Sequence, residues 1–206
     1  MRIPKSHALI FDLGRVLVTF DHQRCYQKLA DLTATTPEQV RTVVEDGIRP
    51  RFDRGQMTVD DVRRYLQVRL GGTLARADLV LAWADVFDPV PEMLTWLKSL
   101  SKRVRLALLS NTDAIHLPWV EEKFGFLHFF EQRVLSYEVG SIKPEAEIYQ
   151  AALRALRLPA PACCFIDDIS AYAEAARAQG MTAVHHRSPA QTQLLVEEWL
   201  ATMDRA

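Results

Sequence analysis

Three short apolar runs of this chain end in side chains that can hold a metal ion or a phosphate group. The first run ends at Asp12, the second at Ser110-Asn111 and the third at Asp167-Asp168. A polar residue after a strand is often only a turn residue, but three such ends favour a site. If the strands are parallel, their carboxyl ends meet at one edge of a sheet. Carboxylates there suit a hard cation such as Mg²⁺, and the hydroxyl and amide groups can donate to phosphate oxygens.

Two further residues extend this candidate site. Gly14 follows Asp12 closely, and its carbonyl can serve as an oxygen ligand because glycine lets the backbone approach an ion. Lys143 lies just before a predicted helix, where a lysine is either an exposed loop charge or a clamp for phosphate. Taken alone, the position of Lys143 favours an exposed loop charge.

The elements around these residues alternate between strand-like and helical patterns. Strands are expected at about His7–Phe11, Val104–Leu109, Cys163–Ile166 and Thr182–His185. Helices are expected from Pro144 through Leu156, from Ala171 to Gln179, and from Pro189 to about Met203. Such alternation predicts an α/β fold with a Rossmann-like parallel sheet.

Residues 21–88 show helical patterns without convincing strands. Helix starts are expected at Thr36 and Thr58, a helix end at Gly71-Gly72, and a linker at Asp88–Pro91. We therefore expect an α/β core of residues 1–20 and 89–206, interrupted by a helical cap of residues 21–88.

Composition narrows the function classes. The 206-residue chain has a formal net charge of −1, which argues against a general nucleic-acid or membrane-surface role. Three cysteines form no disulfide framework and favour a reducing, cytoplasmic compartment. The first seven residues lack the apolar core of a signal peptide, and no apolar stretch is long enough to span a bilayer, so we expect neither a secreted nor a membrane-spanning protein. We expect a small-molecule partner for a monomer or homodimer.

Four motifs together resemble the haloacid dehalogenase-like (HAD) superfamily over nearly the whole chain. They are Phe11–Leu17, Leu109–Thr112, Lys143–Glu145 and Phe165–Asp168, in the order and spacing of that family. The helical insert resembles its cap. The stretches Phe52–Gly55, Arg133–Ser136 and Lys143–Tyr149 look most like the bacterial sugar-phosphate phosphatases, a subgroup that includes α-D-glucose-1-phosphate phosphatase.

The resemblance implies a role for each candidate residue. Asp12 would attack phosphorus and form an aspartyl-phosphate, while Ser110, Asn111 and Lys143 would hold or orient the phosphoryl group. Mg²⁺ would lie on Asp12, the Gly14 carbonyl and Asp168, with Asp167 beside them. The implied role of Arg54 and Gly55, which fall in a specificity loop of the cap, is contact with the leaving group.

Gly14 departs from the family pattern, in which most phosphatases carry a second aspartate as acid and base. The substrate then has a good leaving group, or another group replaces the acid, or the protein is a catalytically impaired phosphate- or partner-binding relative. A haloacid dehalogenase-type hydrolase is the enzymatic alternative, since those relatives also lack this aspartate. Arg15 keeps that alternative open because a cation near the nucleophile could bind a carboxylate, a halide or a phosphate. The acidic pair Asp167-Asp168 favours a magnesium-dependent phosphatase of a small phosphorylated metabolite, with a sugar phosphate preferred.

Overall fold

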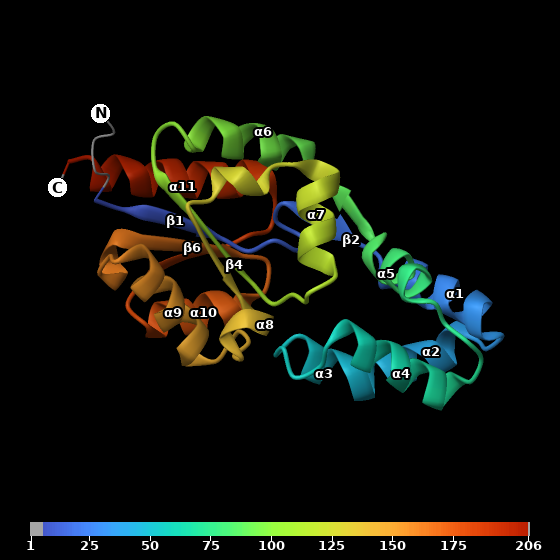
Figure 1. Cartoon of the computed structure of the whole chain (residues 1–206). Helices are drawn as coiled ribbons and strands as arrows, with labels where there is room; N and C mark the ends of the chain where they lie inside the picture. Colours follow the sequence, from blue (N-terminus) through green and yellow to red (C-terminus); the bar gives the residue numbers. More distant parts are fainter. Residues whose placement is uncertain (1–5, 206) are drawn as a thin grey trace.

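The computed structural model describes residues 6–205. Its centre is a five-stranded parallel sheet in the order β5-β4-β1-β6-β7 (Figure 1). The strands are β1 (Ala8–Phe11), β4 (Arg105–Ser110), β5 (Gln132–Leu135), β6 (Cys163–Asp167) and β7 (Thr182–His185). The order reverses at β1, so the carboxyl end of this strand lies at a position where ligands bind in open α/β sheets.

Helices cover both faces of the sheet, which explains why most residues of the central strands β1, β4 and β6 are apolar and buried. Side chains of a strand alternate between the two faces. Leu9 and Phe11 pack in the cluster that includes α6 and α11, whereas Ala8 and Ile10 pack in the cluster that includes α9 and α10. The core helices are α6 (Pro91–Leu100), α7 (His116–Phe124), α8 (Ser136–Val139), α9 (Ala146–Leu156), α10 (Ser170–Ala178) and α11 (Pro189–Met203), with short 3₁₀ turns at Leu127–Phe129 and Ala160–Ala162.

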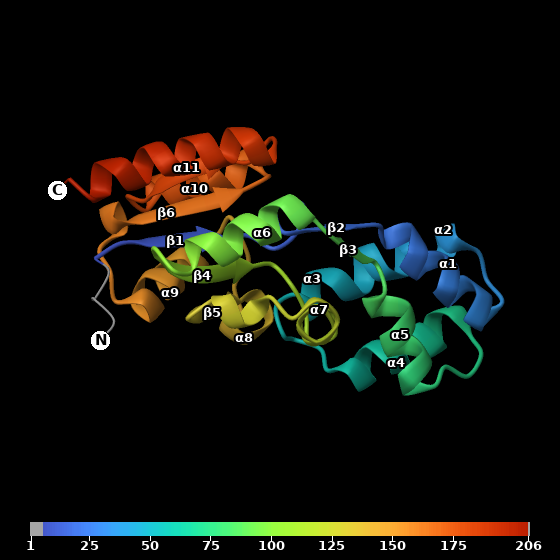
Figure 2. The same cartoon turned by 90° about the horizontal axis from the view of Figure 1, so that it is seen from above.

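A helical insert, defined as the helices between β2 and β3, lies beside the carboxyl ends of the sheet strands (Figures 1 and 2). Its elements are α1 (His22–Thr33), α2 (Pro37–Val43), a π-helical turn (Val44–Ile48), α3 (Arg49–Phe52), α4 (Val59–Leu70) and α5 (Arg76–Ala84). The insert has its own apolar cluster around Leu29, Phe52 and Trp83. The two crossings between insert and sheet are β2 (Val18–Phe20) and β3 (Phe87–Pro89), which pair antiparallel.

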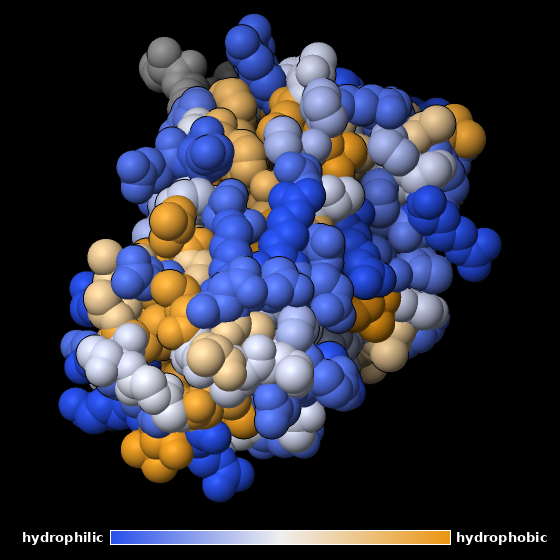
Figure 3. All heavy atoms as spheres, turned by 90° about the vertical axis from the view of Figure 1, so that its right-hand side faces the viewer, coloured by the Kyte–Doolittle hydropathy of each residue, from blue (hydrophilic) through white to orange (hydrophobic). Residues whose placement is uncertain are grey.

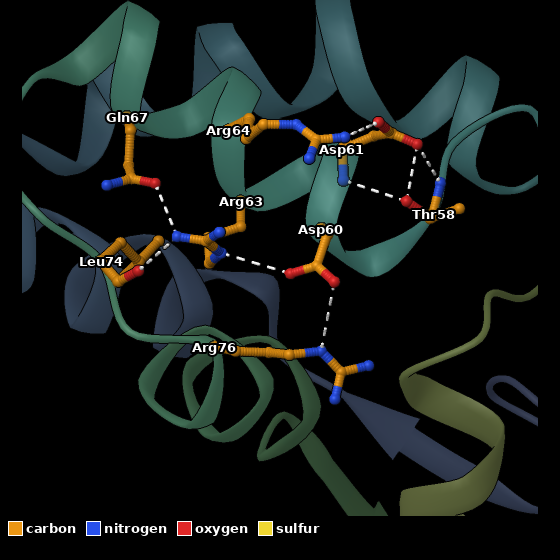
Figure 4. A network of polar contacts seen from close by, with 8 residues as sticks. All are labelled: Thr58, Asp60, Asp61, Arg63, Arg64, Gln67, Leu74 and Arg76. Carbon is orange, nitrogen blue, oxygen red and sulfur yellow. Dashed lines mark hydrogen bonds and ion pairs between the residues drawn. The ribbon is translucent and has the colours of Figure 1, made fainter.

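Polar side chains cap the N-terminus of α4 within the insert (Figure 4). The Thr58 hydroxyl accepts from the Asp61 backbone N–H, and the Asp61 carboxylate accepts from the Thr58 backbone N–H at 2.9 Å. Asp61 also pairs with Arg64 at 2.6 Å. This reciprocal cap confirms the helix start expected at Thr58.

The outer end of the insert is largely hydrophilic. Figure 3 shows a band of hydrophilic side chains across this end, with hydrophobic ones in separate patches. None of the helices in residues 6–205 combines the length and the apolar character that crossing a membrane requires.

Several expected boundaries need correction. The helix expected from Pro144 begins at Ala146, because the Glu145 N–H donates to the Ile142 carbonyl and closes a turn first. The linker expected at Asp88–Pro91 is instead divided between β3 and the first residue of α6. Strand β5 was not expected, since two of its four residues are polar.

Candidate active site

A buried lysine joins two carboxylates at the carboxyl ends of β1 and β6. The Lys143 Nζ atom lies 2.7 Å from Asp12 Oδ1 and 2.6 Å from Asp167 Oδ2. Only 1% of the Lys143 side chain and none of the Asp167 side chain is exposed. Lys143 comes from the turn before α9, so three chain segments meet at this point. The interpretation of Lys143 as an exposed loop charge is wrong.

A third carboxylate completes an acidic cluster. One side-chain oxygen from each of Asp12, Asp167 and Asp168 lies within 4.8 Å of the others. Asp167 is fully engaged, because Oδ1 accepts from the Ile169 N–H at 2.8 Å and Oδ2 accepts from Lys143. Asp12 and Asp168 therefore have the oxygens best able to bind a hard cation directly, and this donor set fits Mg²⁺.

Burial and charge act in opposite directions on these groups. Burial raises the pKa of the Asp12 carboxyl, Lys143 lowers it, and Asp167 raises it again. Burial alone would lower the pKa of Lys143, but the two carboxylates raise it. Lys143 thus stays an ammonium ion that partly offsets two crowded negative charges.

The loop after β1 presents Asp12 in a tight backbone turn. The Leu13 carbonyl accepts from the N–H groups of Leu17 at 2.9 Å and Val18 at 3.1 Å. Arg15 takes a left-handed conformation with φ of 56°. A side-chain carbon built on Gly14 would lie 2.8 Å from Cε1 of Phe20, so the Phe20 ring fills the space next to Gly14.

Asn111 fixes the backbone of Lys143. Its amide nitrogen donates to the Lys143 carbonyl at 3.1 Å, and its amide oxygen accepts from the Lys143 N–H at 2.8 Å. Ser110 makes only a long contact of 3.4 Å with the Asn111 carbonyl, which leaves its hydroxyl available. The structure therefore brings Asp12, Ser110, Asn111 and Lys143 together.

The arginines lie at different distances from this centre. Arg15 places Nη1 4.0 Å from Asp168 Oδ2 and lies over the Phe20 ring, with 65% of its side chain exposed. Arg54 forms a two-pronged ion pair with Glu145, at 2.9 and 2.5 Å. Gly55, at φ of 68°, packs so closely on Tyr137 that an added side-chain carbon would lie 2.0 Å from its carbonyl oxygen. Arg54 and Gly55 thus join the insert to the sheet domain, and neither lines the cavity described next.

A cavity of about 80 Å³ separates the insert from the strand ends. The strand-end side contributes Leu13, Gly14, Ser110, Asn111, Thr112 and His116, and the insert and its crossings contribute Phe20, His22, Arg49, Asp53 and Phe87. Charged and titratable groups of the insert therefore face the loop after β1.

The comparisons with known proteins agree with this arrangement. The family model of the haloacid dehalogenase-like hydrolases matches residues 7–180. The chain belongs to this family. As a HAD hydrolase it has the sheet, the strand-end aspartates and the lysine that the motifs predicted, so both the family resemblance and the fold class are confirmed.

Its relatives include a named phosphatase. The D-ribitol-5-phosphate phosphatase of Bacteroides thetaiotaomicron is 25% identical over 168 residues, covering 78% of this chain and 82% of the relative. A HAD family enzyme from the same organism, crystallised with magnesium and inorganic phosphate, is 27% identical with a TM-score of 0.77, covering 86% and 92% of the two chains. The L-2-haloacid dehalogenase of Xanthobacter autotrophicus shares the fold, with 19% identity and a TM-score of 0.60 over 86% and 76% of the chains.

The sequence did not identify the cavity residues of the insert in this HAD hydrolase. His22 and Arg49 begin helices, and no local pattern marks them. Asp53 lies in the Phe52–Gly55 stretch, in which only Arg54 and Gly55 were assigned a role. Asp113 was also missed, although an aspartate three residues before His116 at a helix start is a capping signal. Its Oδ1 accepts from the backbone N–H groups of Ile115 and His116, each at 2.8 Å.

Proposed function

We propose that this HAD hydrolase is a magnesium-dependent phosphatase of a small phosphorylated metabolite, and that Asp12 is its nucleophile. One observation carries the proposal, namely the three strand-end carboxylates around buried Lys143. Residues 21–88 would act as a cap over residues 1–20 and 89–206. A polyol or sugar phosphate is favoured, because the cavity is small and carries several polar side chains, and because a relative is named a D-ribitol-5-phosphate phosphatase.

Each residue has a chemical task in this proposal. An Asp12 oxygen attacks phosphorus, the bond from phosphorus to the leaving oxygen breaks, and an aspartyl-phosphate results. The Lys143 ammonium and the Ser110 hydroxyl lie where they can bind the phosphoryl oxygens, and Asn111 holds Lys143 in place. Mg²⁺ held by Asp12 and Asp168, with the Gly14 carbonyl as a further ligand, would neutralise charge that otherwise repels the substrate. Asp167 supports this arrangement through Lys143, and the largely exposed Arg15 lies beside Asp168, where it could contact the phosphate.

The first experiment measures phosphate release from p-nitrophenyl phosphate and from a panel of sugar and polyol phosphates. We expect activity that requires Mg²⁺, is removed by a chelator, and falls by at least about 10³-fold in Asp12→Asn, since removal of a nucleophile costs this much or more. Circular dichroism of the variant controls for folding.

A parallel assay monitors halide release from 2-haloacids without metal. Halide release together with an absence of phosphate release would assign the protein to the dehalogenases. Absence of turnover on both panels would contradict an enzymatic role for this site.

A further inference from the structure

The missing aspartate at position 14 leaves no acid beside the nucleophile. Gly14 has no side chain, and the Phe20 ring already occupies the adjacent space, with Cε1 2.8 Å from where a side-chain carbon would begin. Phe20 is held there by His22, at a ring distance of 4.7 Å, and by Arg15, at 5.3 Å. A proton donor for the leaving group must therefore come from elsewhere on the cavity wall.

The opposite wall of the cavity carries a carboxyl group that the fold holds toward the site. Asp53 lines the cavity together with Gly14 and Ser110. It follows buried Phe52, whose ring packs against Trp83 at 5.7 Å. Within residues 6–205 the Asp53 carboxyl has no hydrogen-bond or ion-pair partner, so its oxygens are free to contact a molecule in the cavity.

The loop that carries Asp53 is attached to the sheet domain on its other side. Arg54 is paired with Glu145 at 2.5 Å, and Gly55 lies against the Tyr137 backbone. Glu145 lies two residues from Lys143, so the same turn holds both the phosphate-site lysine and the Asp53 loop. Contacts that do not involve its own side chain thereby hold Asp53 at the cavity that Gly14 and Ser110 also line.

The two histidines of the cavity are poor alternatives. His116 Nδ1 lies 2.8 Å from Asp113 Oδ2, and its Nε2 lies 3.0 Å from the Trp83 carbonyl oxygen. Both ring nitrogens are therefore engaged by protein oxygens and neither is free to face a substrate. Burial lowers the pKa of His22 to about 3, with further lowering by Arg49 and His116, so the ring is neutral near pH 7.

Asp53 is surrounded by charges of both signs. Arg49 on α3 and His116 on α7 favour its ionised form, whereas Asp113 after β4 and Glu45 in the π-helical turn oppose it. Burial is the largest effect and raises the pKa of Asp53 to about 7. A carboxyl group with this pKa can both give and take a proton near neutral pH.

We infer that Asp53, reaching the site from the helical insert, is the acid and base that replaces the aspartate missing at position 14. The inference rests on the proposed phosphatase function. As Asp12 bonds to phosphorus, the Asp53 proton passes to the leaving oxygen, whose bond to phosphorus breaks, and an alcohol departs. The Asp53 carboxylate then takes a proton from the water that attacks phosphorus. The bond to Asp12 breaks, inorganic phosphate leaves, and both side chains return to their initial states.

The test compares substrates with good and poor leaving groups in Asp53→Asn. p-Nitrophenolate departs without a proton, whereas the alkoxide of a polyol phosphate requires one. We expect kcat/KM to fall by about 10²–10⁴-fold on the best alkyl phosphate of the panel, and by less than about tenfold on p-nitrophenyl phosphate. On the alkyl phosphate, wild-type kcat/KM declines above about pH 7 as Asp53 ionises, and this decline is absent in the variant. Asp46→Asn, which removes an exposed carboxylate of the same insert, is the matched control and leaves activity unchanged.

Other outcomes overturn the inference in separable ways. Equal losses on both substrates, a raised KM at unchanged kcat, or a persisting decline above pH 7 would make Asp53 a structural or binding residue. In each of these cases an Asp12- and Mg²⁺-dependent wild-type activity leaves the phosphatase proposal intact. A wild-type protein that hydrolyses p-nitrophenyl phosphate but no alkyl phosphate would show that no acid operates. A wild-type protein that hydrolyses neither substrate defeats the phosphatase proposal and this inference with it.

Discussion

Lys143 is the residue on which the charge balance of the site depends. It contacts Asp12 and Asp167 in an almost fully buried setting and also lies over the rings of Phe165 and Tyr172, at 5.4 and 5.2 Å. Removing one member of a buried ion pair leaves the partner charge without compensation, which costs more than the intact pair contributes. The two carboxylates therefore need Lys143 as their counter-charge in the folded protein.

We predict that Lys143→Met is destabilised by about 3–5 kcal/mol, because it leaves two buried carboxylates without their cation. Urea unfolding in the presence of a chelator measures the difference. Lys98→Met, at an exposed position of α6, is the control and is expected to match the wild-type protein. Equal stability of the Lys143 variant would mean that the carboxylates are compensated by other groups.

At the level of elements, the paired strands β2 and β3 carry the insert, and the Arg54–Gly55 contact holds its far side. Strands β1, β4 and β6 could be predicted because each contains a continuous apolar run, as buried parallel strands require. Strand β7 was expected from a shorter apolar centre, Ala183 and Val184. Strand β5 begins with Gln132 and Arg133, and β2 and β3 have three residues each, so no periodicity identifies them.

The site residues that could be predicted are those marked by a local sequence pattern, as for the strands. Asp12, Ser110 and Asp167 were found because each lies at the end of an apolar run, and the sheet alone brings such ends together. Asp53 reaches the cavity only through the packing of the insert around Phe52 and the Arg54–Glu145 pair. Those contacts join positions far apart in the chain, so they cannot be predicted from the residues next to Asp53.

We predict that Arg54→Ala loosens the insert without unfolding the protein. The pair with Glu145 is partly exposed, and such pairs contribute little to global stability. Hydrogen–deuterium exchange should become faster at residues 52–55 and 137–145, while the strands of the sheet stay protected. Arg64→Ala, which breaks the pair with Asp61 inside the insert, leaves exchange at those two segments unchanged. Equal exchange in the Arg54 variant and wild type would show that the Gly55–Tyr137 contact suffices.

For the molecule as a whole, the fold shifts the pKa values of two buried carboxyl groups near the cavity in opposite directions. His116 holds the pKa of the Asp113 carboxyl well below its usual range, although burial acts to raise it. The pKa of the Asp53 carboxyl is instead raised to about 7, because the effect of burial is larger than that of the neighbouring charges. A carboxyl group whose pKa is raised by burial lowers the stability of the folded protein near neutral pH, and functional sites often carry such a cost.

Two substitutions separate these contributions. The pKa of Asp53 is about 3.9 in an unfolded chain and about 7 in the folded one, so the folded state retains a proton that the unfolded state releases. The free energy of unfolding therefore falls as pH rises through this interval. Asp53→Asn removes the dependence and should be more stable than wild type at about pH 8, by at most about 4 kcal/mol, since one pKa unit corresponds to about 1.4 kcal/mol.

Asp113→Asn provides the opposite case. The depressed pKa of Asp113 contributes stability above about pH 4 that is lost as pH falls further, so this variant should be less stable than wild type near neutral pH. It also removes the carboxylate oxygen that lies 2.8 Å from His116 Nδ1. Urea unfolding of both variants at about pH 5 and pH 8 measures the two effects. A stabilisation by Asp53→Asn that is the same at both pH values would show that Asp53 ionises normally in the folded protein and would remove the electrostatic support for its role as an acid.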